Sequence, residues 1–197
     1  MLDLLTAVRR VNDGVTISFD PGHEWAVSGS PAVAGIARLS NVLLLNEVEF
    51  RALAGGKPGD SDEAVAASLF DRLGRPGVVA IVKRSYGAES FRREGSEVTV
   101  DRQAQVPLTA AEIEDSTGAG DVFAAGVLAV LASGSLTTAM GCLLGLRLAR
   151  HKLGYLGACG HETLAQIAQN FISGQEATSD DFATETVQDT PAMLRHP

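Results

Sequence analysis

Apolar residues along the chain form runs of two kinds, which predict strands and helices in alternation. Short continuous runs, the pattern typical of buried strands, lie at 15–20, 42–45 and 78–83, and strands at 88–93 and 97–101 form a predicted hairpin. Longer runs with apolar positions three or four residues apart predict helices at 2–10, 31–37, 46–54, 61–73, 118–131, 136–153 and 161–172. From 175 to 197 large apolar residues are few, so this segment is predicted to be a disordered polar and acidic tail.

The stretch Asp115-Ser-Thr-Gly-Ala-Gly-Asp121 stands directly before the longest apolar run of the chain. Its small residues allow a tight turn, so a helix is expected to begin at about Gly118. The N–H groups of the first helical turn and the helix dipole would hold an anion such as a phosphate. The carboxylate of Asp121 would then stand at the mouth of that site and accept a proton. A simpler interpretation is that residues 115–117 only cap a core helix.

Polar groups also follow two predicted strands, at the edge of a parallel sheet where ligands bind. Asn46 begins a helix, and Glu49 three residues later completes a capping box, which explains both residues structurally. Such a helix start can also dock a metal and phosphate group, and the two interpretations are compatible. Asp20 ends the first predicted strand and forms a turn with Pro21.

These motifs resemble a known family when they are taken together. The stretch 115–121 with the following Val-Phe-Ala-Ala-Gly resembles the C-terminal signature of the ribokinase-like (PfkB) carbohydrate kinases. Asn46-x-x-Glu49 resembles a second recurrent element of that family, and Asp20-Pro21 resembles its Asp-Pro-Asn turn. The segment 82–88 resembles its nucleotide-side loop, with Ser85 near an expected Gly and one residue fewer. The order of the motifs is that of the C-terminal half of such kinases.

The resemblance implies a phosphoryl-transfer role for the stretch 115–121. It makes Asp121 the catalytic base, and it assigns the anion hole to the backbone of Gly118, Ala119 and Gly120. The implied reaction transfers the γ-phosphoryl group of ATP, with Mg²⁺, to a hydroxyl group of a sugar or nucleoside.

The resemblance also assigns residues around the nucleotide and its metal ions. Three residues are implied to bind the nucleotide: Asn46, Lys83 and Gly87. Glu49 is implied to support Mg²⁺ indirectly, while Asp115 and Thr117 resemble positions that bind a monovalent cation such as K⁺ in some members. From the residues alone, Lys83 or Arg84 can either reach a phosphate or remain a solvated surface charge.

The resemblance implies an α/β fold with three α/β/α layers and a mostly parallel sheet, truncated at its N-terminal side. Residues 1–174 are expected to form the C-terminal portion of the kinase domain, without most sugar-binding residues and without the lid. The exposed sheet edge would favour a homodimer or a complementary N-terminal half. Two alternatives to an active kinase stay open: an inactive homologue that binds nucleotide or acts as a partner subunit, and an unrelated nucleotide-binding α/β protein.

Composition and charge exclude several other classes of protein. The 197 residues are 45% hydrophobic, and their net charge of −8 argues against a nucleic-acid partner. No apolar stretch is long enough to cross a membrane, and the start of the chain lacks the order of a signal peptide, so a cytoplasmic location is expected. The two cysteines are too few for a disulfide framework, and the four histidines are scattered without the spacing of a zinc site.

Overall fold

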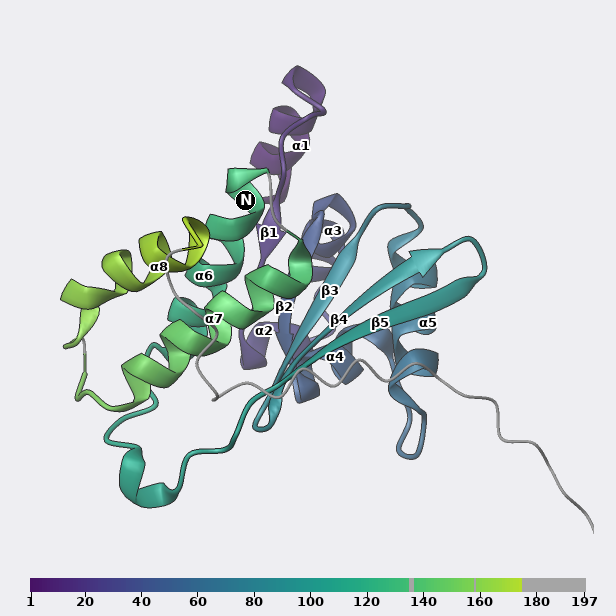
Figure 1. Cartoon of the computed structure of the whole chain (residues 1–197). Helices are drawn as coiled ribbons and strands as arrows, with labels where there is room; N and C mark the ends of the chain where they lie inside the picture. Colours follow the sequence, from purple (N-terminus) through teal and green to yellow (C-terminus); the bar gives the residue numbers. More distant parts are fainter. Residues whose placement is uncertain (135–136, 158, 175–197) are drawn as a thin grey trace, which may run out of the picture.

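The computed structural model describes residues 1–134, 137–157 and 159–174, and the predicted tail at 175–197 lies outside these described residues. Five strands form one sheet in the order β1-β2-β3-β4-β5 (Figure 1). Their bounds are Ser18–Phe19, Val42–Asn46, Val79–Arg84, Gly87–Glu94 and Glu97–Ala104. Strands β1, β2 and β3 run parallel, whereas β4 and β5 are antiparallel to their neighbours. The sheet is therefore mixed, with its parallel part at the start of the chain.

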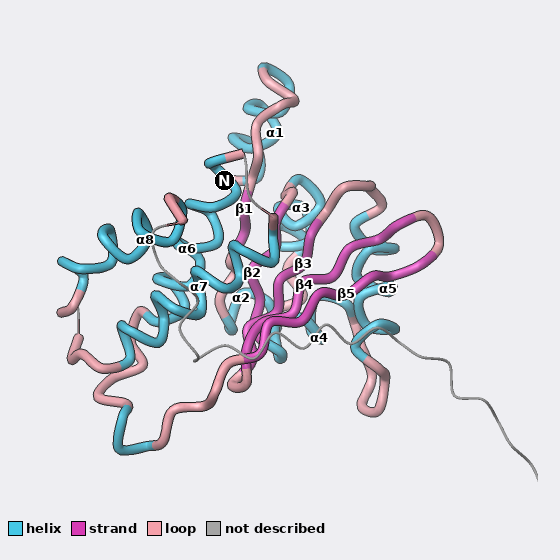
Figure 2. The backbone as a smooth tube through the Cα atoms, viewed as in Figure 1, coloured by secondary structure: helices cyan, strands magenta, loops and turns pink. Residues whose placement is uncertain are grey.

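Helices cover both faces of the sheet, which makes three layers (Figure 2). The α-helices are α1 Leu2–Val11, α2 His23–Val27, α3 Pro31–Leu39, α4 Glu47–Ala54, α5 Asp62–Leu73, α6 Ala119–Ser133, α7 Thr138–Leu153 and α8 Leu164–Ile172. Short 3₁₀ helices, η1 Ala110–Glu112 and η2 His161–Thr163, lie before α6 and α8. Residues of α4 and α5 pack on one face, α6 and α7 pack on the other, and α8 packs outside them. The predicted three-layer α/β/α architecture is confirmed.

The side-chain alternation of the strands separates two cores. Leu43 and Leu45 of β2 belong to the core under α4 and α5, whereas Val42 and Leu44 belong to the core under α6 and α7. Since consecutive strand residues point to opposite faces, a continuous apolar run serves both cores at once. This is why the uninterrupted runs of the sequence correctly predict buried strands.

Strand β1 is shorter than the predicted strand at 15–20. Before Ser18, side chains instead of a neighbouring strand form hydrogen bonds with the backbone. The carbonyl of Val15 accepts a hydrogen bond of 2.7 Å from Arg9, and the N–H of Ile17 donates one of 3.0 Å to the side chain of Asn41. Regular pairing with β2 therefore involves only two residues. Helix α2, which the sequence analysis did not predict, follows directly after this edge strand.

Close packing of α6 against α7 sets the position of the stretch 115–121. A Cβ atom on Gly126 would lie 2.8 Å from the Cα of Gly145, and a Cβ on Gly145 would lie 2.7 Å from the carbonyl oxygen of Phe123. Only glycine allows this approach of the two helices. Helix α6 also packs on the sheet, and Gly120 near its N-terminus lies beside Lys83 at the end of β3.

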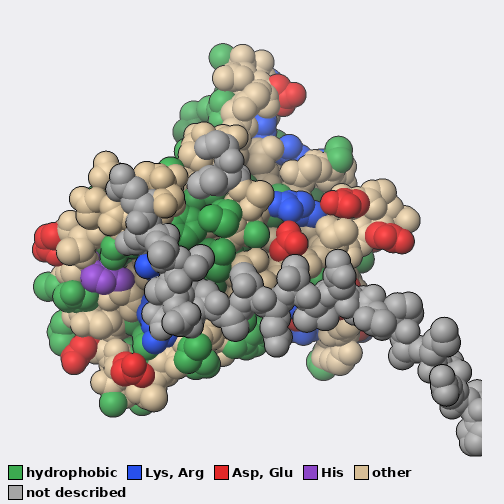
Figure 3. Space-filling view, viewed as in Figure 1, with side chains coloured by type: hydrophobic (Ala, Val, Ile, Leu, Met, Phe, Trp, Pro, Cys, Tyr) green, Lys and Arg blue, Asp and Glu red, His purple; other side chains and the backbone are tan. Residues whose placement is uncertain are grey.

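On the face shown in Figure 3, basic and acidic side chains each lie at several separate places among hydrophobic and other side chains. No helix within the described ranges is both long and apolar enough to span a membrane.

Candidate active site

The ends of the three parallel strands carry the polar side chains of the site. Asp20 follows β1, Asn46 ends β2, and Lys83 lies opposite Asn46 in the register of β3. Parallel strands end at one edge of a sheet, so these groups from distant parts of the sequence lie together. The N-terminus of α6 reaches the same edge.

Helix α6 begins without a side-chain cap. Gly118 occupies the N-cap position with a φ of 78°, and helical residues start at Ala119, as the sequence predicts. The alternative interpretation, that side chains at 115–117 cap this helix, is wrong, because no side chain accepts a hydrogen bond from its first turn. Among the described residues, the N–H groups of Gly120 and Asp121 have no acceptor. The first turn therefore offers unpaired donors, and Asp121 is exposed beside them.

Asp115 holds the loop in front of α6 rather than the helix itself. One of its carboxylate oxygens accepts from the N–H of Thr117 at 2.9 Å, and the other accepts from the N–H of Gly157 at 2.8 Å. These hydrogen bonds, the one from Thr117 above all, lower the pKa of Asp115 to about 2. A monovalent cation at Asp115 and Thr117, which stays a prediction, would have to share a carboxylate already bonded to two backbone groups.

Lys83 extends from β3 to the start of α6. Its Nζ donates to an oxygen of Asp20 at 2.7 Å, and a Cβ atom on Gly120 would lie 3.7 Å from that Nζ. The Lys83 and Asp20 side chains are 22% and 31% exposed. The ammonium group thus lies over the uncapped helix start while solvent can still reach it.

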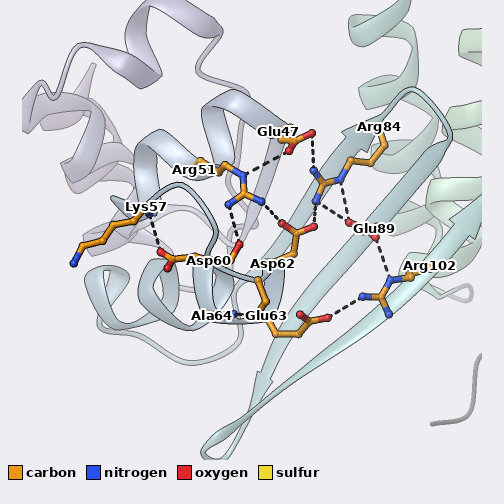
Figure 4. Close-up of polar contacts among 11 residues, drawn as sticks. Glu47, Arg51, Lys57, Asp60, Asp62, Glu63, Ala64, Arg84, Glu89 and Arg102 are labelled. Carbon is orange, nitrogen blue, oxygen red and sulfur yellow. Dashed lines mark hydrogen bonds and ion pairs between the residues drawn. The ribbon is translucent and has the colours of Figure 1, made fainter.

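Arg84, the next residue, lies on the opposite face of the sheet and is 3% exposed (Figure 4). Its guanidinium contacts Glu47 at 3.1 Å, Asp62 at 2.5 Å and Glu89 at 2.8 Å. Arg51 and Arg102 extend these ion pairs to the first turns of α4 and α5 and to β5. Arg84 is therefore neither a solvated charge nor a side chain directed at the start of α6.

Burial and ion pairing act in opposite directions on Arg84. Burial acts to lower its pKa, but the hydrogen bonds and the charge of Glu89 outweigh burial, so the pKa of Arg84 is raised. The guanidinium stays charged in the buried network. We name this network, comprising Glu47, Arg51, Asp62, Glu63, Arg84, Glu89 and Arg102, the Arg84 network.

A pocket of about 350 Å³ opens beside Lys83 and the start of α6. It is lined by Lys83, Arg84, Ser85, Gly87, Gln105, Pro107, Leu108, Ile113, Ala119, Gly120, Phe123, Leu146, Ala149, Arg150 and Leu153. Of the residues that the sequence assigns to the nucleotide or the anion hole, the pocket brings together Lys83, Gly87, Ala119 and Gly120. Asn46, Gly118 and Asp121 do not line it.

The wall of the pocket at β4 depends on Gly87. Its φ is 149°, and a Cβ atom there would lie 2.0 Å from the carbonyl oxygen of Gln103. The turn between β3 and β4 can therefore approach β5 only with glycine at this position. The resemblance to a nucleotide-side loop corresponds in the structure to a tight hairpin turn with β3 and β4 on either side.

Asn46 and Glu49 form the predicted capping box at the start of α4. Glu49 is 3% exposed, and its two oxygens accept from the backbone N–H and the side-chain amide of Asn46, both at 2.8 Å. The described residues contain no group of three or more His, Cys, Asp or Glu side chains that could hold a metal ion. Both oxygens of Glu49 are occupied by these hydrogen bonds, and its indirect role with Mg²⁺ stays a prediction.

Sequence reasoning missed the part of the pocket that comes from η1, its flanking loops and α7. Gln105, Pro107, Leu108 and Ile113 carry no motif, and Leu146 and Arg150 belong to a helix whose contacts with a nucleotide could not be assigned. Helical spacing does place Leu146, Ala149, Arg150 and Leu153 on one face of α7. Nothing in the sequence shows which element that face meets.

Comparisons with known proteins identify the family and the fold. A model of the pfkB family of carbohydrate kinases matches residues 3–162. A comparison with curated protein sequences gave no match. Three similar solved structures are a Burkholderia thailandensis nucleoside kinase in complex with inosine (23% identity, TM-score 0.63), an adenosine kinase from Schistosoma mansoni (18%, 0.64) and a ribokinase from Thermotoga maritima (21%, 0.59).

The chain spans about half the length of these solved structures. The matches cover 87%, 79% and 85% of this chain, but 52%, 46% and 52% of the three kinases. At these identities the similarity concerns the fold, and it confirms the ribokinase-like architecture that the motifs implied.

Proposed function

We propose that this chain, which belongs to the pfkB family of carbohydrate kinases, is a phosphotransferase. It would move the γ-phosphoryl group of ATP to a hydroxyl group of a sugar or nucleoside. One observation supports this most directly: the uncapped start of α6 lies beside Lys83 at the mouth of a pocket. Unpaired N–H donors and an ammonium group at one place suit the oxygens of a transferring phosphoryl group.

Asp121 suits the role of the base. It is exposed in the first turn of α6, one residue after Gly120, and it lies outside the pocket that would hold the nucleotide. A hydroxyl group that approaches from outside the pocket would meet the carboxylate and give up its proton as the phosphoryl group arrives. The N–H groups of Gly118 and Gly120 would stabilise the charge of that group, whereas that of Ala119, the third residue of the predicted anion hole, already donates to the carbonyl oxygen of Ser116 at 3.2 Å.

The pocket suits a nucleotide. Its apolar wall, with Ile113, Phe123, Leu146 and Leu153, would cover a flat base, while Lys83 and the start of α6 would hold the phosphates. Mg²⁺ would neutralise phosphate charge, and Glu49 is the buried carboxylate that fits it through water. The sequence prediction that Asn46 contacts the nucleotide is retained in this proposal, at the end of β2.

The acceptor would bind beside strand β1, at the open edge of the sheet. Trp25 on α2 and Val48 on α4 are 64% and 52% exposed near this edge. A second copy of the chain, or a polypeptide that supplies the N-terminal half of the fold, would pair with β1 and cover these side chains. An acceptor site completed in this way would exclude water from the phosphoryl group.

The alternative is a homologue without activity that binds nucleotide or serves as a partner subunit. Positioning of the acceptor supplies much of the rate in phosphoryl transfer, so a chain that does not position an acceptor would bind nucleotide without turnover. The two proposals differ in one measurable property, which is turnover of ATP in the presence of an acceptor.

The decisive experiment measures ADP release and phosphoryl transfer across a panel of sugars and nucleosides. We expect Asp121→Asn to reduce turnover by about 100-fold or more while ATP still binds. Asp3→Asn is the matched control, because Asp3 is also an acid in the first turn of a helix but lies on α1. Full turnover in Asp121→Asn would overturn the assigned base, and ATP binding without turnover in the wild type would favour the alternative.

A further inference from the structure

We propose that Asp20 is a positioning residue that holds Lys83 over the start of α6. This inference rests on the proposed function, because the contact between Asp20 and Lys83 would place a cation against the phosphates of a nucleotide. The two residues are 63 positions apart in the sequence, yet Lys83 Nζ lies 2.7 Å from a carboxylate oxygen of Asp20. The same Nζ lies 3.7 Å from where a Cβ of Gly120 would be.

Both residues stand on fixed backbone. Lys83 pairs with Asn46 on one side and with Ala88 on the other, so β3 is held by two neighbouring strands. Asp20 follows β1 and precedes the buried Pro21. The Lys83 side chain, in contrast, is a flexible four-carbon stem with a large rotamer entropy. A carboxylate fixed at the sheet edge restricts that freedom before a ligand arrives.

The pair leaves the ammonium group free to bind a ligand. An ammonium group has three donors, and the bond to Asp20 uses one of them. The remaining donors can meet phosphate oxygens without loss of the bond to Asp20. Asp20 therefore orients Lys83 and does not have to be displaced.

Fold stability does not explain this pair. Its side chains are 22% and 31% exposed, and ion pairs as exposed as this contribute little to stability. The neighbouring Arg84, which does join elements of the fold, is 3% exposed and contacts three carboxylates. An exposed pair beside the pocket and the uncapped helix start suits a ligand instead.

The test is a double-mutant cycle on the affinity of the chain for ADP and for adenosine. We expect Lys83→Met to weaken ADP binding about tenfold, and Asp20→Asn to weaken it about fivefold, because Lys83 is no longer held in place. Adenosine, which has no phosphate, should bind all variants within about twofold. In the Lys83→Met background, Asp20→Asn should change the affinity for ADP by less than about twofold.

Asp71→Asn is the matched control, since Asp71 forms an ion pair of 2.6 Å with Arg93 far from the lining of the pocket. It should leave the affinity for ADP unchanged. Tighter ADP binding by Asp20→Asn would overturn the inference, because Asp20 would then only repel phosphate. Additive effects in the cycle would overturn it as well. If the wild type binds neither ADP nor adenosine, the proposed function itself fails.

Discussion

Lys83 and Arg84 are consecutive cations at the end of β3, yet they belong to two very different regions of the molecule. On the face of α6 and α7, Lys83 has one carboxylate partner beside an open pocket and an uncapped helix. On the face of α4 and α5, Arg84 is buried among three carboxylates in the Arg84 network (Figure 4). Arg84, whose donors are used by three carboxylates, joins elements of the fold, whereas Lys83 keeps donors that are available to a ligand.

The difference follows from what each cation touches. Through Glu47, Asp62 and Glu89, Arg84 connects the starts of α4 and α5 to the sheet. Removing it would take a cation from the buried Glu89 and the partly buried Asp62, whereas Glu47 is exposed. Lys83 connects only the end of β1 to its own strand, and water can replace it there.

The largest effect on stability is expected from Arg84→Met. We expect it to lower the free energy of unfolding by about 3 kcal/mol, because Asp62 and the buried Glu89 each lose one of their two arginine partners. Lys83→Met, the matched change one residue earlier, should lower it by less than about 1 kcal/mol. Denaturant unfolding of the two variants measures both values, and equal losses would contradict the contrast between the two faces.

A smaller effect on stability is expected from a change in the contact between α6 and α7, because residues of both helices line the pocket. Gly145→Ala places a Cβ atom 2.7 Å from the carbonyl oxygen of Phe123, so α6 must move away from α7. We expect a loss of about 1 to 3 kcal/mol in unfolding free energy and weaker nucleotide binding. Gly154→Ala, directly after the last residue of α7, is the control, since its nearest contact would be an ordinary 3.6 Å. Unchanged binding in Gly145→Ala would mean that the pocket does not depend on α6.

The smallest effect concerns Asp115, whose contribution to stability changes with pH in acid. Its pKa is lowered to about 2 in the folded protein, so its hydrogen bonds stabilise the fold fully above its ordinary pKa of about 3.8. This stabilisation should be lost as the pH falls from about 3.8 towards 2. Asp115→Asn should therefore lose stability at neutral pH and show a weaker acid dependence in that window. The same acid dependence in wild type and variant, measured by unfolding at each pH, would show that Asp115 does not hold the loop.

Local signals along the sequence determined the secondary structure near the site. Asn46 and Glu49 satisfy each other within a single turn, so their capping box could be predicted without any tertiary contact. Gly118 likewise marks the start of α6, because a tight turn before a long apolar run needs a residue without Cβ. The motif order also indicated the family, since it depends on residue identity alone.

Only the tertiary structure decided which cation lies beside the start of α6. The sequence predicted a strand that ends at 83, but β3 continues to Arg84, and strand alternation then sends the two side chains to opposite faces. The partner of Lys83 comes from another strand end, and the partner of Asp115 comes from the loop after α7. Such contacts join residues 42 or more positions apart, so they depend on how strands and helices pack and not on any local pattern.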